Sequence, residues 1–240
     1  MQMKYEITDK AIKLGNRTLH RIRALIDIPE HGVEAGGIGG YVESGDNLSQ
    51  EGTAWIADDA KVYGKANVSD SAYVDGWARV YGAAEIFGYA QVSGDTRVSD
   101  EAQVSGYAKV SGYARVSDYA RVYDYAFVYA GAEICDSAQV YGYAQVYGDA
   151  KIRESAEVRD NAQVYGDAQV YGHAQVYDDA EIYSAAKIYG WSKVCGMAKV
   201  HGTAKIHCIA EISGGASAGA TASVGRTEGT ETADTQRLRK

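Results

Sequence analysis

The sequence is poor in proline, phenylalanine and cysteine, with one, two and three of them among 240 residues. Cys135, Cys195 and Cys208 form no CxxC pair and leave an odd cysteine, which disfavours a disulfide framework or a cysteine zinc site. No apolar run approaches the roughly 20 residues of a membrane span, and Met1–Glu6 lacks the apolar stretch of a signal peptide. We therefore expect a reduced, cytoplasmic protein without a membrane partner.

Charge of one sign is also not concentrated anywhere in the chain. The formal net charge is −8, and the acidic and basic residues are spread along the whole sequence. Proteins that bind nucleic acid without sequence preference usually carry a basic surface. The composition therefore disfavours nucleic acid or another polyanion as the main partner, although a local site is not excluded.

What the sequence has in place of these features is a six-residue period. Valine or isoleucine occupies every sixth position from Ile56 to Ile212, 27 times in succession without an insertion or a deletion. Alanine occupies the position two residues earlier from Ala54 to Ala210, and only Thr96 and Ser192 depart from it. A fixed short period of this kind is typical of a repeat architecture.

The period also predicts how the chain winds. Side chains alternate between the two faces of an extended segment, so the alanine and the valine of each unit share the inward face. Two residues after the valine, 23 of the 27 units carry glycine or aspartate, which tolerate left-handed backbone angles; the others are Ala130, Glu154, Ser184 and Cys208. A corner every six residues predicts three strands and three corners in each coil of 18 residues. The fold class we expect is all-β: a three-sided parallel β-solenoid.

The unit resembles the hexapeptide repeat of left-handed parallel β-helix proteins, which place an aliphatic residue first and a small residue four positions later. Val62-Tyr-Gly-Lys-Ala66 and Val146-Tyr-Gly-Asp-Ala150 follow this rule, with tyrosine where the family usually has glycine or an acid. The segment from Gly39 to Ile56 is similar to the start of the coil in a bacterial and phage subgroup whose members are labelled transferases. The resemblance implies a left-handed β-helix of about nine coils, commonly a trimer. Its family includes acyltransferases, γ-type carbonic anhydrases and purely structural coils.

The extent of the repeat divides the chain into four predicted segments. Residues 1–53 do not follow the period and are expected to form a small β-rich cap, with strands at Lys4–Thr8 and Leu19–Ile26 and a flexible glycine turn at Gly36–Gly40. Residues 54–212 form the β-helix, and residues 213–225 a partial last coil. Residues 226–240 are polar and aperiodic, which predicts a disordered tail.

Residues 18 apart should lie one above another, so the surface can be interpreted as ladders. Eighteen of the 20 tyrosines fall in the repeat, all at outward positions. Two ladders are candidate binding surfaces: Tyr129, Tyr147, Tyr165 and Tyr183, followed by His201, and Tyr89, Tyr107, Tyr125 and Tyr143. Stacked rings can simply stabilise a parallel sheet. They can also form an interaction surface for self-association or a protein partner, because tyrosine is enriched at interfaces, or they can stack on carbohydrate.

A further candidate surface is a basic row of Lys61, Arg79, Arg97 and Arg115, which is followed by Glu133. Like charges at strand spacing repel one another, so the row needs neutralising partners or binds an anion such as nucleic acid. The corner carboxylates Asp58, Asp100, Asp118 and Asp136 are the expected neutralising groups.

Catalytic candidates are few. Hexapeptide acyltransferases use a histidine as a general base, and His201 and His207 are the weak candidates for that role. They are expected on adjacent faces of one coil, so we expect no metal site, and the sequence indicates no cofactor. It also contains no HExxH motif and no phosphate-binding glycine loop.

The function we expect is therefore a non-catalytic structural or interaction protein, of phage or bacterial origin, that displays tyrosine and charged ladders and forms homo-oligomers, with a trimer favoured. Two alternatives stay open: a CoA-dependent acyltransferase with a histidine base, and a phage inhibitor that binds a host protein. The unbroken period disfavours the enzyme, because acyltransferases of this family usually interrupt the coil with an acceptor loop. Saturable binding of acetyl-CoA would favour the enzyme, and capture of a host protein from lysate would favour the inhibitor.

Overall fold

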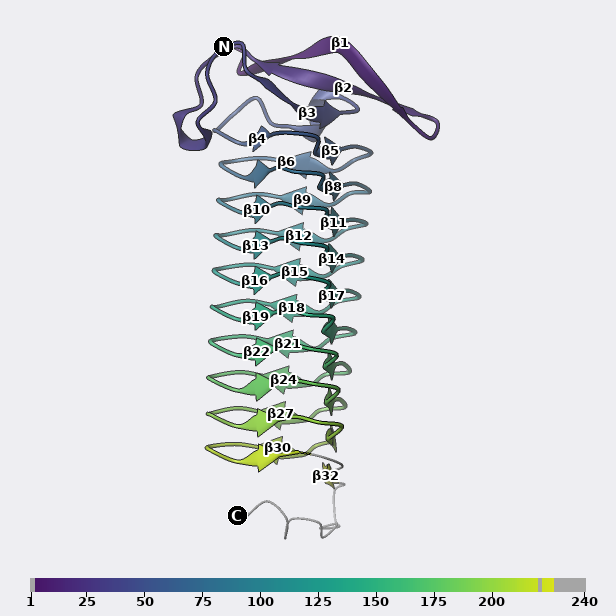
Figure 1. Ribbon diagram of the computed structural model, residues 1–240, viewed down its shortest axis with the longest axis vertical. Helices are drawn as coiled ribbons and strands as arrows, with labels where there is room; N and C mark the ends of the chain where they lie inside the picture. Colours follow the sequence, from purple (N-terminus) through teal and green to yellow (C-terminus); the bar gives the residue numbers. More distant parts are fainter. Residues whose placement is uncertain (1–2, 220–221, 227–240) are drawn as a thin grey trace.

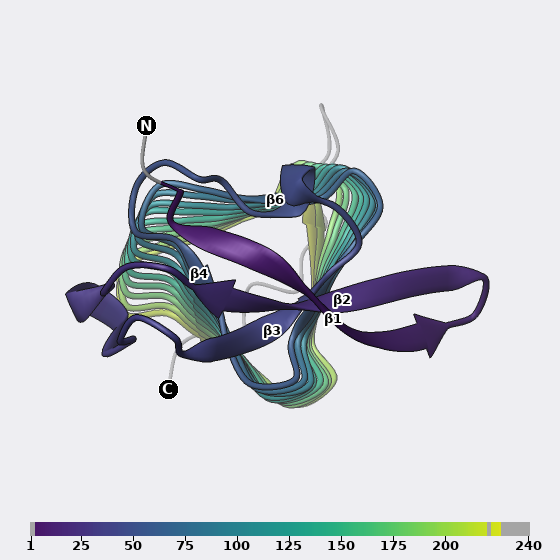
Figure 2. The same cartoon turned by 90° about the horizontal axis from the view of Figure 1, so that it is seen from above.

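The computed structural model describes residues 3–219 and 222–226 of the chain. A stack of similar coils runs the length of the molecule, with the N-terminal strands over one end (Figure 1). Seen along the stack, the coils superpose on a three-sided outline (Figure 2). The predicted disordered tail, residues 226–240, lies outside the described residues except for the backbone of Arg226. None of the helices in the described part has the length and apolar character that crossing a membrane requires.

Three sheets form the three sides, and each coil contributes one short strand to each of them. Sheet 1 contains the solenoid strands β5 (Lys61–Val62), β8 (Arg79–Val80), β11 (Arg97–Val98), β14 (Arg115–Val116), β17 (Glu133–Ile134), β20 (Lys151–Ile152), β23 (Gln169–Val170), β26 (Lys187–Ile188), β29 (Lys205–Cys208) and β32 (Ser223–Arg226). Sheet 2 contains β4 (Trp55–Ile56), β7 (Tyr73–Val74), β10 (Gln91–Val92), β13 (Lys109–Val110), β16 (Phe127–Val128), β19 (Gln145–Val146), β22 (Gln163–Val164), β25 (Glu181–Ile182), β28 (Lys199–Val200) and β31 (Ser217–Ala218). Sheet 3 contains β6 (Asn67–Val68), β9 (Glu85–Ile86), β12 (Gln103–Val104), β15 (Arg121–Val122), β18 (Gln139–Val140), β21 (Glu157–Val158), β24 (Gln175–Val176), β27 (Lys193–Val194) and β30 (Glu211–Ile212).

The register of these strands confirms the predicted coil. Every solenoid strand pairs in parallel with the strand 18 residues away, as Arg97 does with Arg79 and with Arg115. The all-β fold and the 18-residue coil are therefore as expected. Sheet 2 has ten strands, and the tenth, β31, lies in the segment 213–225 that the fading period assigns to a partial coil. The left-handed sense of the winding stays an expectation from the resemblance.

The core consists of the two inward series. Within these series, every valine or isoleucine from Ile56 to Ile206 and every alanine from Ala54 to Ala204 is fully buried. Neighbouring coils thus bury nearly identical layers, and stability is close to a sum of equal contributions from adjacent coils.

The two exceptions in the alanine series behave differently. Thr96 and Ser192 are both fully buried. The hydroxyl of Ser192 donates to the carbonyl oxygen of Tyr189 at 2.9 Å, whereas Oγ1 of Thr96 has no hydrogen-bond partner among the residues that the structure describes. A buried hydroxyl without a partner costs about 1–3 kcal/mol.

We therefore expect Thr96→Val to stabilise the protein. Valine keeps the shape of threonine and removes the unpaired hydroxyl, so the free energy of unfolding should rise by about 1 kcal/mol. Ser192→Ala should leave it unchanged or lower it by about 1 kcal/mol, because that hydroxyl is paired. Urea denaturation measures both changes, and a loss of stability in Thr96→Val would show that the threonine is not a defect of the core.

The corners have the predicted left-handed backbone, even at the four positions that carry neither glycine nor aspartate. All 27 corner residues have positive φ, including Ala130 at 57°, Glu154 at 59°, Ser184 at 59° and Cys208 at 60°. Close stacking of identical corners holds these four in a conformation that costs a residue with a β-carbon about 1–2 kcal/mol.

Corner aspartates have a second role that the period does not reveal. Their carboxylates accept hydrogen bonds from the backbone N–H of the corner 18 residues later. Asp70 accepts from Gly88 at 2.9 Å, Asp136 from Glu154 at 2.9 Å, and Asp178 from Gly196 at 3.0 Å. These bonds tie each coil to the next along the corners.

The N-terminal segment extends sheet 1 over the first coil. Strands β1 (Tyr5–Leu14) and β2 (Arg17–Ala24) form an antiparallel hairpin, β2 pairs with β3 (Ile38–Val42), and β3 pairs in parallel with β5. Two 3-10 helices, η1 (Pro29–His31) and η2 (Gly45–Asn47), flank β3. The strands predicted at 4–8 and 19–26 exist, although the first is longer than expected.

The glycine turn predicted at Gly36–Gly40 is wrong beyond Gly37, because Ile38, Gly39 and Gly40 begin β3. These glycines are required by packing and not by a turn. A β-carbon on Gly39 would lie 2.6 Å from the carbonyl oxygen of Ile56, and one on Gly40 would lie 2.7 Å from that of Ala60. The absence of side chains lets β3 lie directly on the first coil.

Candidate functional site

The most exposed aromatic surface is the row of Tyr89, Tyr107, Tyr125 and Tyr143, which we name the corner ladder. It follows the corner between sheet 3 and sheet 2. The rings are 53, 48, 52 and 61 % exposed in that order. They stack nearly parallel, with centroids 4.8–5.0 Å apart. The sequence prediction of this ladder is confirmed in its geometry.

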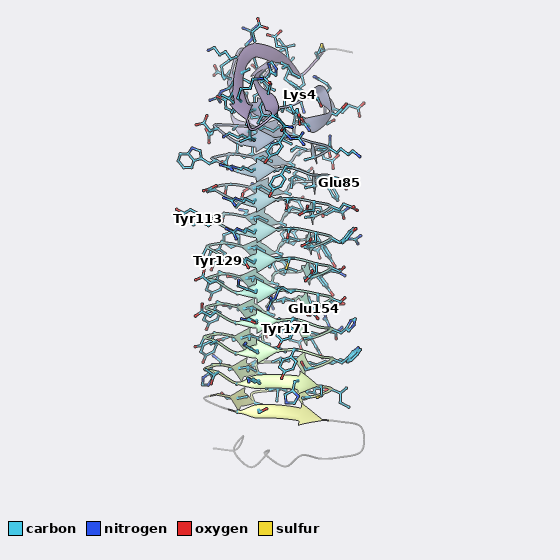
Figure 3. All side chains as sticks on the ribbon, turned by 90° about the vertical axis from the view of Figure 1, so that its right-hand side faces the viewer. Lys4, Glu85, Tyr113, Tyr129, Glu154 and Tyr171 are labelled. Carbon is cyan, nitrogen blue, oxygen red and sulfur yellow. The ribbon has the colours of Figure 1, made fainter. Side chains whose placement is uncertain are left out.

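A second row, the face ladder, begins at Tyr129 and continues through Tyr147, Tyr165 and Tyr183. Its centroids are 4.8–5.1 Å apart, and His201 continues the stack 5.1 Å from Tyr183. Figure 3 shows side chains projecting from the coils and labels Tyr129, the first ring of the face ladder. The face ladder is half-buried, so it presents less aromatic surface than the corner ladder.

The stacking geometry limits what the ladders can bind. Parallel rings about 5 Å apart cover one another's faces, so an interior ring presents only its edge and its hydroxyl group. A sugar or a nucleobase stacks on an open aromatic face. The ladders therefore favour a partner that meets a row of ring edges, which is what a protein surface provides, over carbohydrate.

Burial is the main cause of the raised pKa values in the face ladder and at Tyr141. Burial raises the pKa of Tyr129, Tyr147 and Tyr165 above the usual value, and it is the largest cause in each case. Tyr141, on sheet 3, is raised to about 12, first by burial and then by the charge of Glu157. Its hydroxyl donates to Oε2 of Glu157 at 3.4 Å.

These shifts predict alkaline destabilisation. An unfolded chain releases its phenolic protons near pH 10, before the folded protein does. Folding stability should therefore be complete below about pH 10 and fall as the pH rises towards the folded values, which reach about 12 for Tyr141. Thermal unfolding as a function of pH measures the loss, and Tyr141→Phe should make it smaller. Phenolate absorbance that rises with an apparent pKa near 10 for every tyrosine would contradict the prediction.

The basic row lies where the sequence predicts, with Lys61, Arg79, Arg97 and Arg115 in adjacent strands of sheet 1. It ends at Glu133, which contacts Arg115 at 3.2 Å and Lys151 at 2.8 Å. Of these four cations, Arg115 pairs with Glu133, and the charges of Asp59 and Asp95 act on Lys61.

Asp58, Asp100, Asp118 and Asp136, which the sequence predicts as the neutralising groups, can act on this row only at a distance. Among the described residues, none of these carboxylates forms an ion pair with a member of the row. Their oxygens accept corner hydrogen bonds instead: Asp58 from Gly76 at 3.1 Å, Asp118 from Asp136 at 3.3 Å, and Asp100 from the hydroxyl of Ser99 at 2.7 Å. Sheet 1 therefore keeps a cationic strip next to an acidic corner.

The two candidate catalytic histidines continue tyrosine stacks. His201 stacks on Tyr183, and His207 lies 5.4 Å from Tyr189. A β-carbon at Gly219 would collide with the imidazole of His201, and one at Gly225 with that of His207. Each ring is thus enclosed between a tyrosine of the preceding coil and a glycine of the following one.

Within the described part of the chain, neither histidine has the partners of an activated base. Nε2 of His207 is 3.2 Å from the hydroxyl of Ser223 and Nδ1 is 3.0 Å from Sγ of Cys208, while Nε2 of His201 is 3.5 Å from the hydroxyl of Ser217. None of these contacts is to the carboxylate that usually orients a catalytic imidazole.

Asp118, Cys135 and Asp136 are the one group among the described residues whose ligand atoms lie close enough to share a metal ion, within 4.8 Å of one another. Burial, followed by the charges of Asp136 and Asp118, raises the pKa of the Cys135 thiol to about 11. The thiol is therefore protonated at neutral pH, and both carboxylates already accept backbone hydrogen bonds. Protonated sulfur is a poor metal ligand.

A hollow beneath η1 is the feature that the sequence does not reveal. His31 lies on Tyr73 of sheet 2 with the ring centroids 4.7 Å apart. The only proline of the chain, Pro29, opens η1, but nothing in the aperiodic segment indicates which side of the coil it covers.

The comparisons with known proteins leave the family open. No protein-family model and no curated protein matches this chain. The likeness to hexapeptide-repeat proteins therefore rests on the repeat and on the fold.

Proposed function

We propose that the protein is a non-catalytic interaction scaffold whose corner ladder binds further copies of the same chain. The observation that carries this proposal is the exposure of four consecutive tyrosines along one straight corner, each about half accessible to solvent. Monomeric proteins rarely leave a continuous aromatic surface exposed, and tyrosine is among the residues enriched at interfaces.

A second copy is the partner whose spacing fits best. The ladder repeats with the strand spacing of the coil, about 4.8 Å. Two solenoids with their axes side by side have identical repeats, so the ring edges of one copy can meet the ring edges of the other along the whole row. A globular partner has no such repeat and would engage only part of the row.

The absence of inserted loops in the coil also supports a scaffold. From β4 to β30 each strand follows the preceding one by six residues, so no side of the stack carries an inserted loop. Neighbouring coils cover the faces of the His201 and His207 rings, so only the ring edges are open to an acyl acceptor.

Sedimentation velocity of the full chain over a range of concentrations tests this function. We expect a species of about three times the 25.7 kDa chain mass, since trimers are common in the fold that the repeat resembles. A dimer would still be consistent with association through the corner ladder, and only the expected number of chains would change. A monomer at all concentrations, together with saturable acetyl-CoA binding in calorimetry, would replace the scaffold by the acyltransferase.

A further inference from the structure

The segment between β2 and β3 is the part of the described chain that leaves the coil and covers one of its sides. It carries η1 outside the three-sided outline (Figure 2). The His31 ring lies on Tyr73, and the residues around them enclose two adjoining hollows on the outer surface of sheet 2.

The two hollows share three residues and so form one groove. One, of about 360 Å³, is lined by Glu30, His31, Tyr73, Asp75, Gln91 and Ser93. The other, of about 270 Å³, is lined by Glu30, His31, Ser71, Tyr89, Gln91 and Tyr107. Glu30, His31 and Gln91 lie between them, so a ligand that occupies one hollow reaches the other.

The groove is acidic. Glu30 and Asp75 line it, and no lysine or arginine does. Burial lowers the pKa of His31, so its ring is neutral at pH 7. Burial and the charge of Asp58 both raise the pKa of Asp75, which reflects a carboxylate without a cationic neighbour. Lys4 does not fill that role, because its ammonium donates to the carbonyl oxygens of Ala54 at 2.9 Å and Glu51 at 3.3 Å.

One acceptor of the lining is unpaired. Oδ1 of Asp75 is buried and has no hydrogen-bond partner among the described residues. Buried polar atoms in folded proteins are nearly always paired, so an unpaired acceptor in a groove indicates a missing donor.

The groove also ends at an open aromatic face. Tyr89 begins the corner ladder, and among the described rings it stacks only on Tyr107. The corresponding position one coil earlier is Ser71, which lines the same hollow and is too small to cover the ring. A cation can lie over such a face and gain about 0.5–2 kcal/mol.

From the two carboxylates, the unpaired acceptor and the open face of Tyr89, we infer that this groove binds an organic cation, a guanidinium group above all. A guanidinium donates in a plane to a carboxylate and stacks on tyrosine at the same time, and Glu30 lines the same hollow as Tyr89. The group can belong to a small molecule or to an arginine side chain of a peptide. The inference does not depend on self-association.

Calorimetric titration of the full chain tests the inference. The probes are agmatine, the tripeptide acetyl-Gly-Arg-Gly-amide and its neutral isostere with citrulline in place of arginine. We expect saturable binding of at least one cationic probe, weakened by added salt, and at least tenfold weaker binding of the citrulline peptide. Tighter binding of agmatine would indicate a small-molecule ligand, and tighter binding of the arginine peptide a protein segment.

Matched variants locate the site. Glu30→Gln and Asp75→Asn should each weaken binding of the cationic probe at least fivefold. Glu85→Gln, which removes a carboxylate from sheet 3, should leave it unchanged, and the unfolding temperature of each variant shows whether it folds. Equal affinity for the arginine and citrulline peptides, or full affinity in both groove variants, would overturn the inference.

Discussion

Replacing Tyr107 and Tyr125 together with serine is expected to weaken self-association about 100-fold or more. These two rings are the interior of the corner ladder, and two central aromatic side chains of an interface commonly contribute 3 kcal/mol or more between them, about a factor of 100 in affinity. The fold should persist, because Ser71 already occupies the equivalent corner position one coil before Tyr89. Sedimentation velocity gives the change in association, and circular dichroism confirms that the variant folds.

The matched control is Tyr113→Ser. Tyr113 is the most exposed tyrosine, at 72 %, and it lies on a different corner without a stacked neighbour among the described rings. This variant should associate as the native chain does. If the control loses association as completely as the double variant, exposed tyrosines act through general hydrophobicity and the ladder has no special role.

The second large effect concerns the period itself. Deleting residues 109–126 removes one complete coil, and the chain on either side rejoins in the same register. Because each coil contacts only its neighbours, we expect a folded protein whose urea m-value falls by about a tenth, in proportion to the surface it buries. The ladder also survives, since Tyr143 then lies directly after Tyr107.

Deleting residues 109–125, one residue fewer, should be far more damaging. Every residue after the deletion is then displaced by one position, which turns the valines outward unless one corner closes with an altered length. We expect the unfolding temperature to fall by more than 10 °C relative to the 18-residue deletion, or the melting curve to split into two transitions. Equal stability of the two deletions would mean that the coil does not depend on its 18-residue register.

The coil can be predicted from the sequence because each structural requirement of the coil is met by a residue at a fixed position in the six-residue period. Burial demands the valine and alanine series, and a left-handed corner demands glycine or a tolerant residue. Even Ala130 and Glu154, which break the corner rule, take positive φ, because identical corners above and below hold them in that conformation. The ladders follow with no further assumption, since residues 18 apart must stack.

The remaining features depend on contacts that a period does not specify. Whether Asp118 pairs with a cation or with the next corner depends on a few ångströms of side-chain reach, a distance that a repeat pattern does not contain. Gly39 is small because the first coil lies against it, which local sequence cannot distinguish from a turn. The groove requires knowing that His31 lies on Tyr73, a contact between an aperiodic segment and the solenoid.

Sedimentation velocity of a chain lacking residues 109–114 tests most directly whether the stacked surface drives association. Removing one six-residue unit keeps every valine inward but rotates all later ladders to the next side of the coil, so Tyr125 no longer continues the row of Tyr107. We predict that this variant folds as stably as the chain lacking residues 109–126 but sediments as a monomer, whereas the 18-residue deletion assembles like the native protein. Equal association of the two deletions would contradict the account.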